Sequence, residues 1–306
     1  MSIKEHPPQS GDSKESLVLH VPVLLEQTLE ILRPAEGESY LDLTAGYGGH
    51  ARGFLAMTEN YAESVLVDRD DYAVKRLKSF SDKGTRLLHT DFVSAAMQLI
   101  KEGKQFDIVL ADLGVSSPQL DEASRGFSFT NSGSLDMRMD RRQSVSAETL
   151  VNNASVNELT RIITQYGEEP IGYARQIVTA IVSSRPLSTT EELASIIKQT
   201  YRGKWKKTHP ATRTFQALRI AVNDELKQVE DLMPLLSRLL KPGGRVGVIS
   251  FHSLEDRLVK HFFKEQFEAG LEAELAPLNK KPILGSINDV HNPRARSSKL
   301  RAAVKK

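Results

Sequence analysis

The sequence predicts an α/β protein with a mostly parallel sheet and an inserted helical domain. Three observations predict this fold. Residues 39–57 read as a strand, a glycine loop and a helix, residues 106–111 form an apolar strand, and residues 157–201 contain three amphipathic helices with no strand between them. Continuous apolar strands are typical of parallel sheets covered on both faces, so helices should flank this sheet.

The glycine loop follows the first predicted strand, residues 40–43. Glycine permits positive φ and lets a ligand approach the backbone, and the first N–H groups of the next helix face that ligand. A second strand, 64–68, ends at Asp68, about 20 residues after the loop, which is the spacing used to hold a ribose diol. The loop fits the pattern Gly-x-Gly-x-x-Ala over residues 46–51, so it predicts an adenosine-containing ligand without separating NAD from S-adenosylmethionine.

The other elements of the sheet part follow in order. A helix is predicted over His20–Leu32, stopped by Pro34, a second over 72–80, and a third strand over 85–89. Ligands of open α/β sheets bind outside the carboxyl ends of the strands. Four aspartates fall at these ends: Asp42, Asp68, Asp91 and Asp112.

The helical domain is predicted between about residues 135 and 213. Its helices cover 157–166, 173–183 and 191–201, the last preceded by a capping box at residues 188–191. The sheet then resumes. We expect a long helix over 222–240, a turn at 241–244 and a strand at 245–250, which suit a methyltransferase sheet, although a dehydrogenase could contain the same elements.

Composition limits the chemistry. The chain has 306 residues, a net charge of +2 and no cysteine, which excludes disulfides, iron–sulfur clusters and thiol nucleophiles. Methylation at C5 of a pyrimidine needs a thiolate, so it is excluded, whereas modification of an exocyclic amine is not. His50 and His252 lack a suitable ligand set, so we expect no metal. No segment is long and apolar enough to span a membrane, so we expect a soluble, cytoplasmic protein.

Two basic segments are candidates for contact with RNA. Residues 202–213 hold five Lys or Arg, no acid and the only tryptophan, and residues 292–306 hold six basic residues and no acid. Basic residues interleaved with an aromatic suit phosphate contact and base stacking. We therefore predict that both segments bind RNA.

Several blocks resemble the ribosomal RNA small subunit methyltransferase H family. They run in family order from residue 20 to residue 300 and lie at 42–50, 112–121, 125–129, 135–140, 209–216, 250–257 and 292–298. The resemblance implies a Rossmann-like class I S-adenosylmethionine-dependent methyltransferase that modifies the N4 amine of a cytidine in small-subunit (16S) ribosomal RNA, as naked RNA or as the 30S subunit. It assigns these residues to the cofactor: Gly48, Gly49, His50, Asp68, Phe92, Asp112 and Gln119. The domains expected on this basis are a flexible tail (1–19), two methyltransferase segments (20–134 and 214–306, the second with a basic C-terminal tail) and the helical insertion (135–213).

Asp112 is the candidate catalytic residue. Methyl transfer depends mainly on alignment of donor and acceptor, and an acceptor for the N–H of the amine would stabilise the charge that develops there. The alternative is that Asp112 only lines the cofactor pocket. The chain lacks the Asp/Asn-Pro-Pro-aromatic motif of many amine methyltransferases, so an aromatic that stacks on the base must come from elsewhere, and the options are Phe127, Phe129 and Phe251.

Two other functions remain open at this stage. The glycine loop and Asp68 also fit a nicotinamide-dependent oxidoreductase, and the fold could serve a non-catalytic RNA-binding assembly factor. Whether the protein forms a homodimer is not determined by these patterns.

Overall fold

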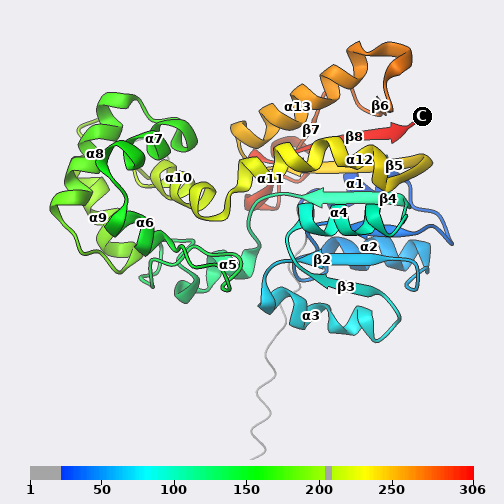
Figure 1. Cartoon of the computed structure of the whole chain (residues 1–306), viewed down its shortest axis with the longest axis horizontal. Helices are drawn as coiled ribbons and strands as arrows, with labels where there is room; N and C mark the ends of the chain where they lie inside the picture. The colour runs from blue at the N-terminus through cyan, green and yellow to red at the C-terminus, as the bar shows by residue number, and fades with distance from the viewer. Residues whose placement is uncertain (1–21, 204–208) are drawn as a thin grey trace, which may run out of the picture.

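The structure is a computed structural model that describes residues 22–203 and 209–306. The predicted tail, 1–19, and part of the first basic segment, 204–208, lie outside the described residues. Figure 1 shows two parts side by side, a sheet flanked by helices and a smaller group of helices. No helix within the described ranges has the length and apolar character needed to cross a membrane.

The sheet has the order β3-β2-β1-β4-β5-β8-β6, with β7 paired to β8. Its first five strands are parallel, and β8 runs antiparallel to β5, β6 and β7. The chain turns from β1 towards β2 on one side and from β4 towards β5 on the other, so the β1/β4 boundary is the switch point at which such sheets bind ligands. The strands are β1 Tyr40–Asp42, β2 Val65–Asp68, β3 Arg86–His89, β4 Phe106–Asp112, β5 Leu240–Ser250, β6 Leu275–Pro277, β7 Ile283–Leu284 and β8 Lys299–Lys305.

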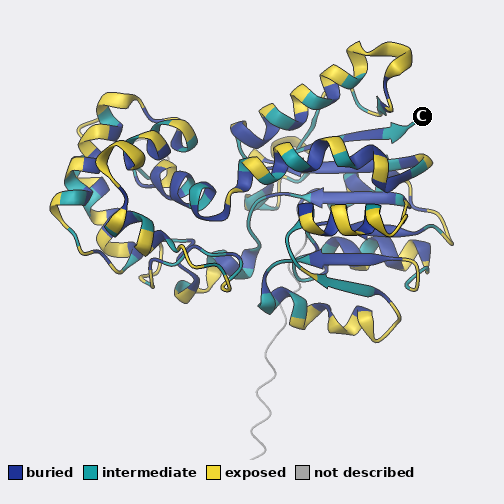
Figure 2. Ribbon diagram, viewed as in Figure 1, coloured by how far each residue is buried: buried dark blue, intermediate teal, exposed yellow. Residues whose placement is uncertain are grey.

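Helices cover both faces of this sheet, which confirms the reading of strand 106–111. Ile108 and Leu110 of β4 belong to one buried cluster, whereas Val109 and Ala111 belong to the cluster on the opposite face. Figure 2 shows the central strands as deeply buried and the edge strand β3 as half-buried, with exposed residues on the outer sides of the helices. The helices of this part are α1 Leu25–Leu32, α2 Gly49–Thr58, α3 Asp71–Ser81, α4 Phe92–Lys101, α11 Glu225–Leu232, α12 Leu236–Leu239, α13 Ser253–Glu268 and α14 Gly285–Asn288.

The helical part contains α5 Ser117–Asp121, α6 Ala147–Asn153, α7 Val156–Gly167, α8 Ile171–Ser183, α9 Thr190–Thr200 and α10 Thr212–Asn223. The three helices predicted here are confirmed as α7, α8 and α9. The capping box is one residue later than predicted, because Thr189 caps α9 and pairs with Glu192. The apolar core extends from Phe127 to Val222, and the boundaries 135–213 stay a prediction.

The long helix predicted over 222–240 starts later and is interrupted: α11 begins at Glu225, and a 3₁₀ turn at Met233–Leu235 separates it from α12, which ends at Leu239. Asp224 has φ 52°, in the left-handed region, so α10 ends before it and α11 begins after it. Aspartate tolerates this conformation better than most residues, and it turns the chain from the helical part back to the sheet. Short 3₁₀ turns occupy Ala123–Arg125, Met233–Leu235, Gly270–Glu272 and Pro293–Ser297.

The prediction that the chain ends in a basic C-terminal tail is wrong. Residues 299–305 form β8, which lies inside the sheet between β5 and β6. Leu300 and Ala302 are buried and alternate with the half-buried Lys299 and Arg301, and Ala303 is buried in the cluster on the other face of the sheet.

The helical part leaves and rejoins the sheet at one edge. β4 ends at Asp112, which pairs with Ile249 near the carboxyl end of β5. The returning chain starts α11 at Glu225, whose carboxylate lies within 4.8 Å of ligand atoms of His252 and Glu255, just beyond that same strand. Both connections therefore meet at the carboxyl edge of the sheet.

Candidate active site

The glycine loop joins β1 to α2 in a conformation that needs glycine. Gly46 has φ 53° and Gly48 has φ 78°, and a Cβ on Gly48 would lie 2.5 Å from the Phe80 ring. Gly48 is the N-cap of α2 and provides no side chain to cap it. Gly49 follows as the first residue of α2. The first N–H groups of α2 are therefore placed to bind polar atoms of a ligand.

Asp68 stands at the end of β2 beside this loop. Its Oδ2 accepts the N–H of Gly46 at 2.7 Å and its Oδ1 accepts the N–H of Asp70 at 2.8 Å. Burial raises the pKa of Asp68 to about 6. Each carboxylate oxygen has a second lone pair, so Asp68 can hold the loop and still accept hydroxyl groups.

Asp112 and His50 face each other across the loop. The Nε2 atom of His50 lies 3.1 Å from the carbonyl oxygen of Val23 and donates to it, which leaves a lone pair on Nδ1, 3.4 Å from Oδ2 of Asp112. Burial lowers the pKa of His50 to about 4, so the ring is neutral at neutral pH. Burial, with Asp42 and Glu255 nearby, raises the pKa of Asp112 well above its ordinary value. The raised pKa favours the protonated form of Asp112, which would donate to the lone pair on Nδ1.

The other oxygen of Asp112, Oδ1, is buried and has no hydrogen-bond partner among the described residues. A buried polar atom without a partner costs roughly 1–3 kcal/mol, which indicates that something absent here completes it. The Asp112 side chain keeps 23% of its surface exposed, although Oδ1 itself is covered.

Asp42 adds a third carboxyl group at this edge. It accepts from the Tyr40 hydroxyl at 2.8 Å and from the Thr44 N–H at 3.1 Å, while the Thr44 hydroxyl accepts from the Asp112 N–H at 2.6 Å. Burial raises the pKa of Asp42 to about 7. Three carboxyl groups with raised pKa values, one buried and two half-buried, make this edge a favourable place for a positively charged ligand.

Gln119 reaches the site through a buried network that the sequence did not reveal. Its Nε2 donates to Oδ2 of Asp70 at 2.7 Å, and Nη1 of Arg125 donates to the same oxygen at 2.7 Å. The Arg125 and Asp70 side chains are 1% and 2% exposed. This network ties the segment after β4 to the residue that also positions Asp68. The only sequence signal for Arg125 is that it begins the segment 125–129, which resembles the family; this signal does not predict its pairing with Asp70.

The remaining predicted residues near strand ends have other local roles. Asp91 caps α4 by accepting the N–H of Ser94 at 2.8 Å. Phe92 is the first residue of α4, and its partly buried ring packs against the apolar cluster of the sheet. A cofactor contact by Phe92 stays a prediction.

Of the three aromatic candidates, Phe251 lies beside the carboxyl end of β4. Its ring is 3.1 Å from the point where a Cβ on Gly114 would lie. Phe127 and Phe129 instead belong to the packing of the helical part, where the Phe129 ring contacts those of Phe215 and His209.

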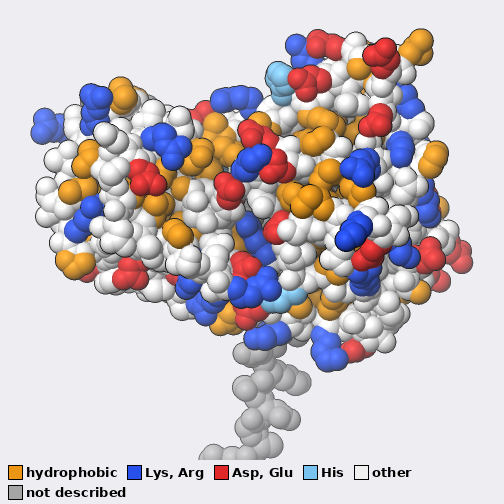
Figure 3. Space-filling model, viewed as in Figure 1, with side chains coloured by type: hydrophobic (Ala, Val, Ile, Leu, Met, Phe, Trp, Pro, Cys, Tyr) orange, Lys and Arg blue, Asp and Glu red, His pale blue; other side chains and the backbone are white. Residues whose placement is uncertain are grey.

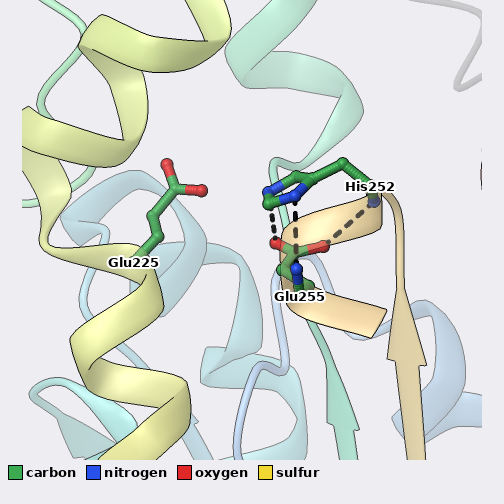
Figure 4. A group of neighbouring side chains, drawn as sticks. All are labelled: Glu225, His252 and Glu255. Carbon is green, nitrogen blue, oxygen red and sulfur yellow. Dashed lines mark hydrogen bonds and ion pairs between the residues drawn. The ribbon is translucent and has the colours of Figure 1, made fainter. Parts of the chain in front are cut away.

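Glu225, His252 and Glu255 form a cluster of metal-ligand type just beyond β5 (Figure 4), with ligand atoms within 4.8 Å of one another. Both oxygens of Glu225 accept from Arg219, at 2.8 Å each. Glu255 accepts the N–H of Phe251 at 2.8 Å, and although burial favours the opposite shift, His252 and Arg219 hold its pKa below the ordinary value. The guanidinium of Arg219 already balances the negative charge of the two glutamates, so this cluster of three side chains does not require a metal ion.

Most basic side chains of the second basic segment bind within the protein, and RNA binding by either segment stays a prediction. In residues 292–306, five of the six basic side chains bind within the protein: Arg294 to Asp121, Lys299 and Arg301 to Asp256, Lys305 to the Leu240 carbonyl and Lys306 to the Gly270 carbonyl. This segment is therefore not a free basic arm. On the face shown in Figure 3, basic and acidic side chains are interspersed, in keeping with the small net charge.

A second basic feature appears on the helical part. An open groove of about 410 Å³ lies between α8 and α9 and is lined by Arg175, Gln176, Thr179, Ala180, Ser183, Gln199, Thr200 and Arg202. None of these residues is acidic. Arg175 and Arg202 form no ion pair within the described part of the chain.

Comparison with known proteins gives consistent matches over nearly the whole chain. The profile of the MraW methylase family matches residues 17–306. Three relatives carry the name ribosomal RNA small subunit methyltransferase H. The one from Cyanothece is 46% identical, covering 93% of this chain and 94% of its own. Those from Synechocystis and Nitratidesulfovibrio vulgaris are 45% and 43% identical, covering 94% and 96% of this chain and 93% and 88% of their own.

Proposed function

The chain belongs to the MraW methylase family, and on that premise we propose that it transfers the methyl group of S-adenosylmethionine to the N4 amine of a cytidine in small-subunit (16S) ribosomal RNA. It is an S-adenosylmethionine-dependent methyltransferase. The nicotinamide-dependent alternative is not favoured by these relatives. The cytoplasmic location expected from the sequence is part of the proposal.

The residues at the carboxyl edge suit this cofactor. The loop 46–50 and the free N–H groups of α2 fit its polar methionine end, Asp68 fits its ribose, and the buried carboxyl groups fit a cation. When bound, S-adenosylmethionine supplies a methyl group activated by a positively charged sulfur. Gly48, Gly49, His50, Asp68, Phe92, Asp112 and Gln119 are the residues that we propose to hold it.

The unpartnered Oδ1 of Asp112 is the observation that carries the proposed chemistry. This atom would accept a hydrogen bond from the amine and stabilise the positive charge that develops on its nitrogen. That role requires the ionised form, which burial disfavours by raising the pKa of Asp112. A cation within about 4–6 Å lowers the pKa of a carboxyl group by about 1–3 units. We therefore assign Asp112 a role that begins only once the site holds its positively charged ligand.

The groove between α8 and α9 is the proposed RNA contact of the helical part. Arginines without acidic neighbours suit the phosphate backbone, which provides affinity without base specificity. Arg202 also adjoins the basic stretch 204–208, whose lysines would extend the same charge along the sequence.

The decisive experiment is methyl transfer to a defined nucleoside. The protein is incubated with labelled S-adenosylmethionine and undermethylated small subunits, and in parallel with naked 16S RNA, followed by nucleoside mapping. We expect one cytidine to gain a methyl group at N4. Label on a different atom, or none with either substrate, would refute the proposal. The same experiment excludes a purely structural assembly factor.

A further inference from the structure

A second buried polar atom lacks a partner at this edge of the sheet. Nε2 of His252 has no hydrogen-bond partner in the described part of the protein, although the His252 side chain is only 9% exposed. Oε1 of Glu255 lies 3.1 Å from Nε2, the ion-pair contact drawn in Figure 4, but the two atoms do not have the geometry of a hydrogen bond. As with Oδ1 of Asp112, the unpaired atom points to an absent partner.

His252 and Asp112 follow neighbouring strands. The N–H of Leu113 donates to the Ile249 carbonyl at 2.9 Å, so β4 and β5 remain paired up to their ends. Beyond that point the Phe251 ring packs on Gly114. The N–H of Phe251 donates to Glu255 at 2.8 Å, which fixes the His252–Glu255 pair just beyond the end of β5. The two unpartnered atoms therefore share one edge.

The hydrogen-bond character of the two atoms differs. The Glu255 N–H donates to Nδ1 of His252 at 3.4 Å, which leaves the ring proton on Nε2 as a donor. Ionised Asp112 can only accept. The edge therefore presents one acceptor and one donor.

We propose that His252 recognises the target base by donating a hydrogen bond from Nε2 to the ring nitrogen N3 of cytosine. This nitrogen is next to the N4 amine, whose N–H donates to Asp112. Cytosine presents a donor at N4 and an acceptor at N3, which this pair matches. Uracil presents the reverse at both positions, so each contact would become a mismatch. This inference rests on the proposed function, and it adds a residue that determines base specificity.

His252 has a competing structural role, because it caps α13. Two substitutions separate the roles. His252→Asn keeps a good N-cap but is too short to reach as far as Nε2, whereas His252→Gln keeps a donor at about that reach and caps poorly. His261→Gln is the matched control, since His261 lies on the same helix, pairs with Glu265 and is 72% exposed.

The test compares kcat/KM on small subunits reconstituted with cytidine or 3-deazacytidine at the methylated position. We expect His252→Asn to lower kcat/KM about 10- to 100-fold on cytidine, His252→Gln to retain more activity than Asn, and His261→Gln to match the unmodified protein. Affinity for S-adenosylmethionine should stay within about twofold, since His252 is not proposed to touch it. On 3-deazacytidine, which lacks the N3 acceptor, the unmodified protein should lose a similar factor and His252→Asn should lose little more.

The outcomes distinguish the two proposals. If the unmodified protein methylates no cytidine, the proposed function fails and this inference fails with it. If cytidine is methylated but His252→Asn retains full activity, or activity follows thermal stability across the variants, His252 is a helix cap alone. The inference would also be overturned if the fold-losses in kcat/KM from His252→Asn and from 3-deazacytidine multiply when the two changes are combined. Independent losses would show that Nε2 and N3 do not interact.

Discussion

The sheet part and the helical part hold their charged groups in opposite ways. At the sheet edge, Asp42 is buried and Asp68 and Asp112 are half-buried, and desolvation raises the pKa of each. The helical part has an apolar core and leaves Arg175 and Arg202 exposed in an open groove. Buried groups respond to pH and to the shape of one ligand, whereas exposed charges respond to salt and accept many phosphates. The difference suggests a division between chemical selectivity and general RNA affinity.

The largest expected effect is a loss of kcat on changing a carboxyl group at the sheet edge. Asp112→Asn removes the acceptor and keeps the shape, so we expect kcat at saturating cofactor to fall about 10²- to 10⁴-fold. Asp107→Asn is the control, because Asp107 lies towards the other end of β4 and pairs with Lys241. Normal turnover by Asp112→Asn would leave Asp112 as a pocket residue only.

The next effect concerns the junction between the parts. Arg125→Met leaves Asp70 buried and unpaired, and breaking such a pair costs about 3–5 kcal/mol of the free energy of unfolding. Arg142→Met removes an ion pair in which the arginine is 56% exposed, so it should cost at most about 1 kcal/mol. Urea denaturation of both variants measures the difference. Equal losses would mean that the Asp70–Arg125 pair does not anchor the helical part.

The pH dependence of cofactor binding tests the buried carboxyl groups directly. A cationic ligand lowers pKa values that stand near 7 for Asp42 and near 6 for Asp68, so binding releases protons. Affinity for S-adenosylmethionine should therefore rise as pH increases through these values and level off above about 7. The rise is at most about tenfold per pH unit for each proton released. Calorimetry in two buffers of different ionisation enthalpy counts the protons, and affinity that falls with pH would contradict this account.

The smallest expected effect is a change in RNA affinity on removing the exposed arginines of the groove between α8 and α9. Replacing Arg175 and Arg202 with Gln removes two proposed phosphate contacts, which should reduce the slope of log affinity against log salt by about 1.4, or about 0.7 per contact. Between 50 and 200 mM salt this is roughly a sevenfold change in RNA affinity. Arg161→Gln, an exposed arginine on α7, is the control. An unchanged slope would place the RNA elsewhere.

Local sequence patterns predicted most of the sheet part but not its long-range contacts. The glycine loop and the apolar strands gave the right elements because their signals lie within a few residues. The break at Asp224 was missed because apolar periodicity continues on both sides, and a single left-handed residue leaves little trace in sequence. Residues 299–305 were read by their charge, although Leu300 and Ala302 already alternate as in a strand.

The site was predicted as a set of strand ends rather than as a network. Asp68 and Asp112 follow from the rule that ligands bind beyond parallel strands. The pair of Asp70 and Arg125 spans 55 positions, and no local pattern connects them. The unpaired state of Nε2 in His252 likewise depends on packing that only the folded chain reveals.

The meeting of both connections at one sheet edge has an evolutionary consequence. The segment from Leu113 to Asp224 begins and ends near the carboxyl ends of the neighbouring strands β4 and β5. A loop whose ends lie close together can change greatly in length at little entropic cost to the sheet, since each doubling costs only about 0.6 kcal/mol. The helical part is thus positioned as an exchangeable module. Such a fold can adopt new substrates by remodelling the part of this excursion beyond Arg125, while the proposed cofactor residues and the contacts of Gln119 and Arg125 with Asp70 stay in place.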